Sequence, residues 1–143
     1  MYGRTVVKHK CVLLHVEDDD ATSYLFQAAL REAGASLRCF RVIDGQEALD
    51  FLSQNEPYRR APRPDLVLLD INLPRKNGLD VLAEMKGNPR LRDIRVVMFS
   101  TSTSPDDRTK SLELGAEDYM PKEGDFEGFV TVAKSVCQRL TQE

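Results

Sequence analysis

Short apolar runs alternate along the chain with longer segments in which apolar residues recur at helical spacing. The first run, C-V-L-L-H-V at 11–16, is nearly continuous, as in a strand that is covered on both faces. The second run, at 37–42, alternates apolar residues with two arginines and predicts a strand nearer a sheet edge. The predicted strands are therefore 11–16, 37–42, 66–69, 95–99 and 116–120.

Five helices are predicted between and after these strands. The first ends at Gly34, since glycine is common one position beyond a helix. The fourth begins after Ser104, a good N-cap, with Pro105 in its first turn, and it ends at Gly115. The apolar positions expected on the helices are, in chain order, Tyr24, Leu25, Ala28, Ala29 and Ala33; Ala48, Leu49 and Leu52; Leu79, Leu82, Ala83 and Met85; Leu112 and Leu114; and Phe126, Phe129, Val130, Ala133, Val136, Cys137 and Leu140.

Strands that alternate with helical crossovers predict an α/β fold with a parallel sheet and helices on both faces. Right-handed crossovers leave few topologies, and for five strands the flavodoxin-like order 2-1-3-4-5 is the leading one. The segment 53–64 has three prolines and three arginines and is predicted to be a loop. Its arginines, Arg59, Arg60 and Arg63, are expected to be a solvated surface, with contact to an acidic partner as the alternative. The expected organisation is a single doubly wound (βα)5 domain over 1–143.

The composition narrows the function classes. The chain has 143 residues with a net charge of −3, so charge gives no reason to expect binding to nucleic acid or to an anionic membrane. No apolar run is long enough to cross a bilayer, and the basic N-terminus lacks the apolar core of a signal peptide. Cys11, Cys39 and Cys137 form no metal-binding pattern and are expected to be buried, reduced thiols of a cytoplasmic protein. His9 and His15 have no metal-ligand spacing, and His15 is expected to be a hydrogen-bonded core residue.

Polar groups follow the predicted strands at the end of the sheet where this topology places a ligand. The first strand runs into Glu17 and Asp18, and the third ends at Asp70. Mutual repulsion among these carboxylates would raise a pKa or require a cation. Ser100 at the end of the fourth strand adds a hydroxyl, and Lys122 after the fifth adds an ammonium. Such a set suits a hard divalent ion such as Mg²⁺ together with an oxyanion.

Each residue also has a plain structural explanation. Asp18, with the two aspartates after it, can cap a helix, and Asp70 can form a turn. Ser100 can be a loop hydroxyl and Lys122 a surface cation. Four strand ends that deliver matched groups to one rim favour a functional site over four separate coincidences.

These residues resemble the receiver domain of two-component response regulators over nearly the whole chain. V-E-D-D at 16–19 is similar to the acidic pair of that family, and L-L-D-I-N-L-P-R-K-N-G at 68–78 resembles its phosphoacceptor segment. Ser100, Tyr119 and Lys122 match the hydroxyl, the aromatic residue and the lysine of the family. The insertion at 53–64 and the run P-R-P-D-L-V-L-L-D-I-N-L-P-R-K-N-G at 62–78 most resemble single-domain regulators that partner phytochrome-type histidine kinases.

The resemblance implies a phosphorelay function. Asp70 would accept a phosphoryl group from a partner histidine kinase in a Mg²⁺-dependent reaction, and the protein would catalyse its own phosphorylation and dephosphorylation without being an enzyme for other substrates. Asp18 and Asp70 would bind Mg²⁺ directly, Asn72 through its backbone carbonyl, and Glu17 through water.

The resemblance also implies how the signal would leave the domain. Lys122 and Ser100 would hold the phosphoryl oxygens, and Tyr119 would then favour an inward rotamer. The changing surface would be formed by the fourth helix, the fifth strand and the fifth helix. Since no DNA-binding or enzymatic segment is seen, output is expected through a downstream protein or phosphotransfer target, with a homodimer on this face as a further option.

One departure concerns the lysine loop. The family usually has proline directly after the lysine, often in a cis Lys–Pro bond, whereas here Pro121 precedes Lys122 and Glu123 follows it. A cis bond without proline costs roughly 2.5–4 kcal/mol, so none is expected between Lys122 and Glu123. The sequence therefore does not explain how the ammonium is aimed, and Glu123 could compete with phosphate for it.

Three other function classes fit the sequence less well. An aspartyl-phosphate hydrolase would need an acid–base aspartate where Asn72 stands, and also a cap domain. A flavodoxin-like cofactor binder would need hydroxyl and N–H groups after the first strand, where this chain has acids. A degenerate receiver that acts only as a binding module conflicts with the intact Asp18, Asp70 and Lys122, although the displaced Pro121 weakly favours it.

Overall fold

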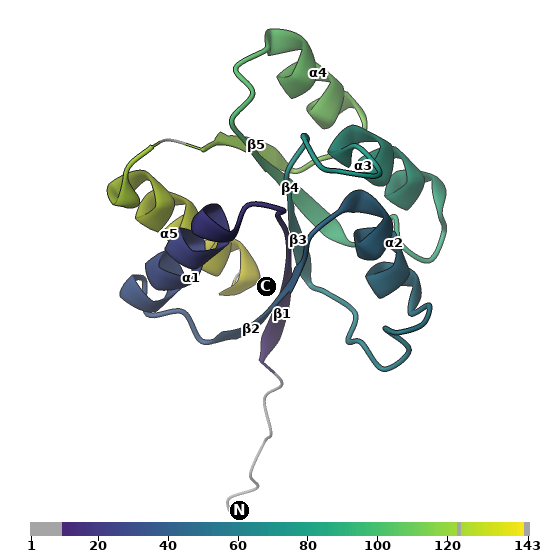
Figure 1. Ribbon diagram of the computed structural model, residues 1–143, viewed down its shortest axis with the longest axis horizontal. Coiled ribbons are helices and arrows are strands. Elements are labelled where there is room, and N and C mark those ends of the chain that lie inside the picture. Colours follow the sequence, from purple (N-terminus) through teal and green to yellow (C-terminus); the bar gives the residue numbers. More distant parts are fainter. Residues whose placement is uncertain (1–9, 123, 142–143) are drawn as a thin grey trace, which may run out of the picture.

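The structure is a computed structural model, and it describes residues 10–122 and 124–141. Five strands alternate with five helices in this part of the chain (Figure 1). In order, the elements are β1 (Cys11–Val16), α1 (Asp20–Glu32), β2 (Leu37–Val42), α2 (Gly45–Ser53), β3 (Leu66–Leu69), α3 (Gly78–Gly87), β4 (Arg95–Ser100), α4 (Pro105–Glu113), β5 (Asp118–Pro121) and α5 (Phe126–Thr141).

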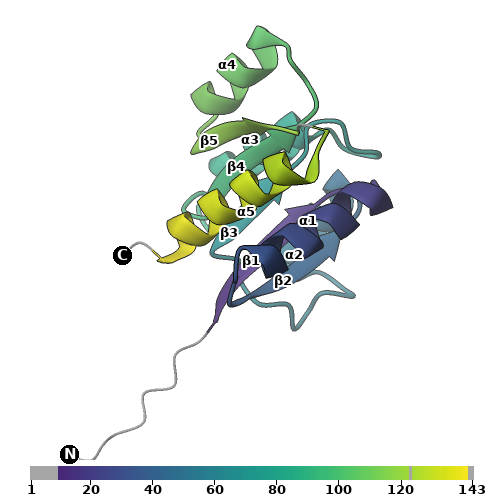
Figure 2. The ribbon, with the colours of Figure 1, turned by 90° about the vertical axis from the view of Figure 1, so that its left-hand side faces the viewer.

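The strands form one parallel sheet in the order β2-β1-β3-β4-β5, which confirms the predicted flavodoxin-like topology. Helices α1 and α5 cover one face, while α2 and α3 cover the other and α4 lies beside β5 and α3 (Figures 1 and 2). The central strands β1, β3 and β4 are buried on both faces, which is why their sequences are continuous apolar runs. None of the helices in the described ranges is both long and apolar enough to cross a membrane.

Two apolar clusters fill the space between the sheet and its helices. The cluster under α1 and α5 includes Leu13, Phe26, Phe99 and Phe129. The cluster on the opposite face is built from the alternate positions of the same strands and from α2 and α3. Because side chains alternate across a strand, neighbouring residues such as Met98 and Phe99 belong to opposite clusters.

Four helices begin at capping residues in the loops that follow the strands. Asp19, Asp44, Asn77 and Ser104 each accept a backbone N–H from the first turn of the next helix, and the expected Ser104 cap is confirmed. These caps fix where each helix starts relative to the strand end, and so they set the shape of the rim.

The loop after β3 is held by a close backbone approach at Gly78. A Cβ atom built at Gly78 would lie 1.9 Å from the backbone oxygen of Asp70. The backbone N–H of Gly78 donates to the carbonyl of Ile71 at 2.7 Å. Only glycine fits here, and the start of α3 is thereby pressed against the residue that ends β3.

Several expected details were wrong. Tyr24 is 69% exposed, since the inward positions of α1 are Ser23, Phe26, Ala29 and Leu30. The fifth strand begins two residues later than predicted, at Asp118, and the fourth extends to Ser100. Other positions that differ from expectation are Leu112 and Phe126, which are exposed, Ala83, which is also exposed, and Val81 and Phe51, which are buried.

Two further expectations concern cysteine and histidine. The three cysteines are free, but each is half-buried. His15 is buried as expected, yet neither of its ring nitrogens has a hydrogen-bond partner among the described residues. His9 lies outside the described residues. The loop arginines Arg59, Arg60 and Arg63 are exposed, as a solvated surface would be.

Candidate functional site

Three carboxylates meet at the ends of β1 and β3. These strands are neighbours, and Val16 is in register with Leu69, so the residues that follow each strand lie side by side. One carboxylate oxygen from each of Glu17, Asp18 and Asp70 can be chosen so that all lie within 4.8 Å of one another. Glu17 and Asp70 are 1% and 5% exposed, whereas Asp18 is exposed to solvent.

The ammonium of Lys122 enters this group from β5. Its Nζ atom lies 2.5 Å from Oε1 of Glu17 and 2.8 Å from Oδ2 of Asp70. The backbone N–H of Lys122 donates to the carbonyl of Ser100 at 2.8 Å, which continues the β4–β5 pairing beyond Pro121. The order Pro121–Lys122 therefore still brings the ammonium to the carboxylates. Glu123, the expected competitor for it, lies outside the described residues.

Burial and the neighbouring opposite charges shift the pKa values of Glu17 and Lys122 in opposite directions. Burial raises the pKa of Glu17, and the bond to Lys122 offsets this only in part, while Asp70 adds to the rise. Burial by itself would lower the pKa of Lys122, but hydrogen bonds to Asp70 and Glu17 outweigh it and the pKa is raised. Lys122 is therefore a fixed positive charge at neutral pH, and it is shared by two carboxylates.

The donor set fits a hard divalent cation. Glu17, Asp18 and Asp70 offer only oxygen atoms, which Mg²⁺ and similar ions prefer. Three carboxylates against one ammonium leave an excess of negative charge, and a divalent cation would neutralise it. Asn72 follows closely, and its backbone N–H lies 3.3 Å from Oδ1 of Asp70.

The two other acids of the E-D-D-D run have structural partners. Asp19 caps α1 by accepting from the backbone N–H and the hydroxyl of Thr22, and these bonds lower its pKa. Asp20 pairs with Arg41 at 2.8 Å. The capping explanation therefore holds for Asp19, while Asp18 is left facing the buried carboxylates.

Arg41 is a component that the sequence reasoning missed. The alternation of apolar residues and arginines along 37–42 predicts an outward side chain on an edge strand at this position. Its Nε atom donates to the backbone carbonyl of Glu17 at 2.9 Å, and the side chain also reaches Asp20. Arg41 thus ties β2 to the acidic loop. The sequence did contain a signal for this role, because Arg41 lies near the carboxyl end of β2, the strand that neighbours β1.

Ser100 and Tyr119 meet at the loop after β4. Ser100 is fully buried, and its hydroxyl accepts from the backbone N–H of Ser102 at 3.3 Å. Tyr119 is also buried, and its hydroxyl donates to the carbonyl of Ser102 at 2.7 Å. The hydroxyl of Ser102 in turn donates to Asp107 in the first turn of α4. One short loop therefore links Ser100 to Tyr119 and to the start of α4.

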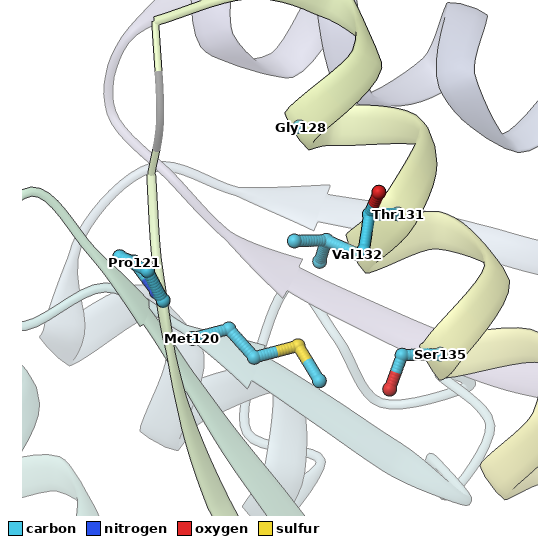
Figure 3. Close-up of a pocket in the computed structure, with 6 residues that line it drawn as sticks. All are labelled: Met120, Pro121, Gly128, Thr131, Val132 and Ser135. Carbon is cyan, nitrogen blue, oxygen red and sulfur yellow. The ribbon is translucent and has the colours of Figure 1, made fainter.

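A cavity of about 390 Å³ lies elsewhere, between β5 and α5 (Figure 3). The side chain of Met120 points from β5 toward Val132 and Ser135 of α5. No carboxylate of the acidic group lines it, so the cavity is separate from the site at the strand ends.

Comparison with known proteins agrees with this geometry. The model of the response regulator receiver domain family matches residues 13–134. Response regulator Rcp1 of Synechocystis sp. is 44% identical over 111 residues, covering 78% of this chain and 76% of the relative. The probable methanogenesis regulatory protein FilR2 of Methanothrix harundinacea is 38% identical over 116 residues, covering 81% and 74%.

Solved structures give the same result. The phosphorylated cyanobacterial phytochrome response regulator RcpA superposes with a TM-score of 0.83 at 40% identity, covering 90% of this chain and 91% of that one. The Mn(2+)-bound form of response regulator Rcp1 superposes with a TM-score of 0.82 at 39% identity, covering 88% and 91%.

Proposed function

Because this chain belongs to the response regulator receiver domain family of signalling proteins, we propose that it accepts a phosphoryl group on Asp70 from a partner histidine kinase. The observation that carries the proposal is the contact between the buried Asp70 carboxylate and the Lys122 ammonium, 2.8 Å apart. A carboxylate held beside a fixed positive charge is a suitable nucleophile for phosphoryl transfer.

The transfer exchanges one bond for another. An oxygen of Asp70 attacks the phosphorus of a phosphohistidine, the P–O bond forms, and the P–N bond breaks with the electron pair leaving on the imidazole. The Lys122 ammonium and the Ser100 hydroxyl hold the transferred oxygens. Positioning and charge neutralisation supply most of the catalysis, since the transition state spreads negative charge over the equatorial oxygens.

A metal ion would be held by Asp18 and Asp70 directly, by the backbone carbonyl of Asn72, and by Glu17 through water. We propose Mg²⁺ as the physiological ion, which would neutralise charge on the phosphoryl oxygens. Support comes from the oxygen-only donor set and from the Mn(2+)-bound form of the similar regulator Rcp1.

The phosphorylated state would be transmitted through the α4-β5-α5 face. The phosphoryl group on Asp70 would attract the Ser100 hydroxyl. The loop that follows Ser100 also binds the Tyr119 hydroxyl, through the carbonyl of Ser102. The Tyr119 ring is already buried in this structure, so phosphorylation would increase the population of an inward rotamer that already exists. The chain would act in the cytoplasm as one receiver domain over 1–143, relaying the signal to a downstream protein or phosphotransfer target, or to a second copy in a homodimer.

The partner kinase is proposed to be of the phytochrome type. Support comes from the similar regulators, among them the cyanobacterial phytochrome response regulator RcpA. The recognition surface would surround Asp70 at the carboxyl end of the sheet, where the histidine must reach the carboxylate.

Incubation with acetyl phosphate and Mg²⁺ tests whether Asp70 is the phosphoacceptor. The modified residue is located by mass spectrometry. Wild type is expected to gain one phosphoryl group on Asp70, and Asp70→Asn none at that position. Asp44→Asn is a matched control, because Asp44 is an equally buried aspartate that follows β2 and asparagine also caps helices. Unlabelled wild type that also fails to bind beryllofluoride would instead identify a degenerate receiver.

A further inference from the structure

The proposed function leaves a question about Lys122. In the described residues its side chain has three charged or aromatic contacts, with Glu17, Asp70 and the ring of Phe99. Both carboxylates would acquire other partners when the site works, because a metal ion would draw on their oxygens and Asp70 would become an acyl phosphate. The third contact is the only one of these that the reaction leaves unchanged.

The position of Phe99 follows from the sheet register. Phe99 pairs with Met120 of β5, and Lys122 follows two residues later on the same face. The Lys122 stem therefore crosses the ring, and its Nζ atom lies 5.6 Å from the ring centroid. That distance is within the reach of about 6 Å for a cation–π interaction.

Burial strengthens this contact. Phe99 is almost completely buried, and the Lys122 side chain is only 8% exposed. A cation over an aromatic face interacts more strongly when water is excluded, because the negative face of the ring is then less screened. A leucine at this position would keep much of the apolar bulk and offer no such face.

The ring itself cannot easily turn away. Phe129 contacts it edge-on with centroids 5.6 Å apart, and Phe26 lies at 6.0 Å. His15 adds a third ring at 6.3 Å. Phe99 is therefore a fixed platform between the α1–α5 core and the Lys122 ammonium.

We propose that Phe99 is a positioning residue for Lys122, whose ring face holds the ammonium at the site while Glu17 and Asp70 exchange their partners. This inference rests on the proposed phosphoryl transfer. It also answers the question raised by the lysine loop, since β-sheet register and an aromatic platform aim the ammonium without a proline after Lys122.

The test replaces Phe99 with phenylalanines of increasing fluorination, ending with pentafluorophenylalanine. Fluorine removes negative charge from the ring face while changing the shape little, so the fold is retained. Phe99→Leu removes the face altogether. The matched control is the same replacement at Phe51, a buried ring that packs on the opposite face of the sheet, away from Lys122.

Two readouts separate positioning from general stability. The first is acetyl phosphate labelling with Mg²⁺, in which the rate constant at saturation is expected to fall about three- to tenfold with the fluorinated ring, in graded steps, while the half-saturating concentration changes little. The second uses the unphosphorylated protein and needs no activity. Protons on Cε of Lys122 should show an upfield ring-current shift in NMR spectra that is lost in Phe99→Leu.

The outcomes separate this inference from the proposed function. Wild type that is never labelled on Asp70 refutes the phosphoacceptor proposal, while the NMR shift still tests whether Lys122 lies on the ring. Labelled wild type with an unchanged rate constant across the fluorinated series refutes the role of Phe99. Equal losses at Phe51 and Phe99 would also refute it, because they would reflect stability alone.

Discussion

Replacing His15 with leucine is expected to raise the free energy of unfolding. His15 is 1% exposed and packs against the rings of Phe26 and Phe99, with centroids 4.8 and 6.3 Å away. Neither ring nitrogen finds a hydrogen-bond partner in the described part of the chain. The imidazole thus gives up its hydration on folding and gains no hydrogen bond in return.

The size of the effect follows from that loss. A buried polar group without a partner costs about 1–3 kcal/mol, and replacing it with an apolar group of similar shape removes the penalty. Repacking around leucine costs less than about 1.5 kcal/mol. We therefore expect His15→Leu to stabilise the fold by about 1 kcal/mol at pH 7.5, where the histidine of the unfolded chain is also neutral.

Lowering the pH should enlarge the difference in unfolding free energy between His15→Leu and wild type. Burial, and then the charges of Lys122 and Arg41, lower the pKa of His15 from 6.5 to about 3. The unfolded state therefore binds a proton that the folded state refuses, and stability is lost as pH falls from 6.5 toward 3. At pH 5 this loss amounts to about 2 kcal/mol, from 1.36 kcal/mol per pH unit.

Urea unfolding of both proteins at pH 7.5 and pH 5 measures the effect. Other groups titrate alike in the two chains, so the change in their difference isolates His15. Tyr24→Leu, a substitution at an exposed aromatic position, serves as a control and should leave the pH dependence unchanged. We expect the variant to be more stable than wild type at pH 7.5 and to lose less stability between pH 7.5 and pH 5. If His15→Leu were instead less stable than wild type at pH 7.5, and if its stability fell as much as that of wild type between pH 7.5 and pH 5, the imidazole would have to be hydrogen-bonded in solution.

Three smaller predictions concern other contacts. Gly78→Ala should lower the unfolding free energy by about 3 kcal/mol and slow labelling by acetyl phosphate, because the new Cβ meets the backbone oxygen of Asp70. Tyr119→Phe should cost about 1 kcal/mol in thermal unfolding, since it leaves the carbonyl of the half-buried Ser102 without its donor. Glu117→Gln should cost about 0.5–1 kcal/mol at pH 7, allowing for solvent screening of its partly exposed ion pairs. Hydrogen bonds from Arg95 lower the pKa of Glu117 from 4.5, so this difference should disappear in urea unfolding well below pH 4.5.

The strand ends were the part of the site that sequence could predict. Continuous apolar runs identify strands covered on both faces, and the topology makes β1 and β3 neighbours. Glu17 and Asp70 directly follow those runs, so their meeting required no knowledge of side-chain conformations. The same reasoning placed Lys122 on the rim once β5 was recognised.

Side-chain direction was harder to predict. Tyr24 was assigned to the apolar face of α1, yet it is exposed, because Ser23 occupies the inward position and an apolar residue can lie on either face. Phe99 appears in the sequence only as the last apolar residue of a buried strand. Nothing in that pattern shows that its ring face meets an ammonium two strand positions further along β5.

The charges at the strand ends explain why Lys122 needs a contact besides its two carboxylate partners. Glu17, Asp18 and Asp70 carry three negative charges against one from Lys122, so the site has a net charge of −2 when all are ionised. A divalent cation would balance that charge, but it would draw on the oxygens that hold the ammonium. Metal binding would therefore weaken the ion pairs of Lys122 at the proposed transfer step, in which the phosphoryl oxygens need the ammonium. A neutral aromatic face avoids this competition, because it attracts the ammonium and offers no oxygen to the metal ion.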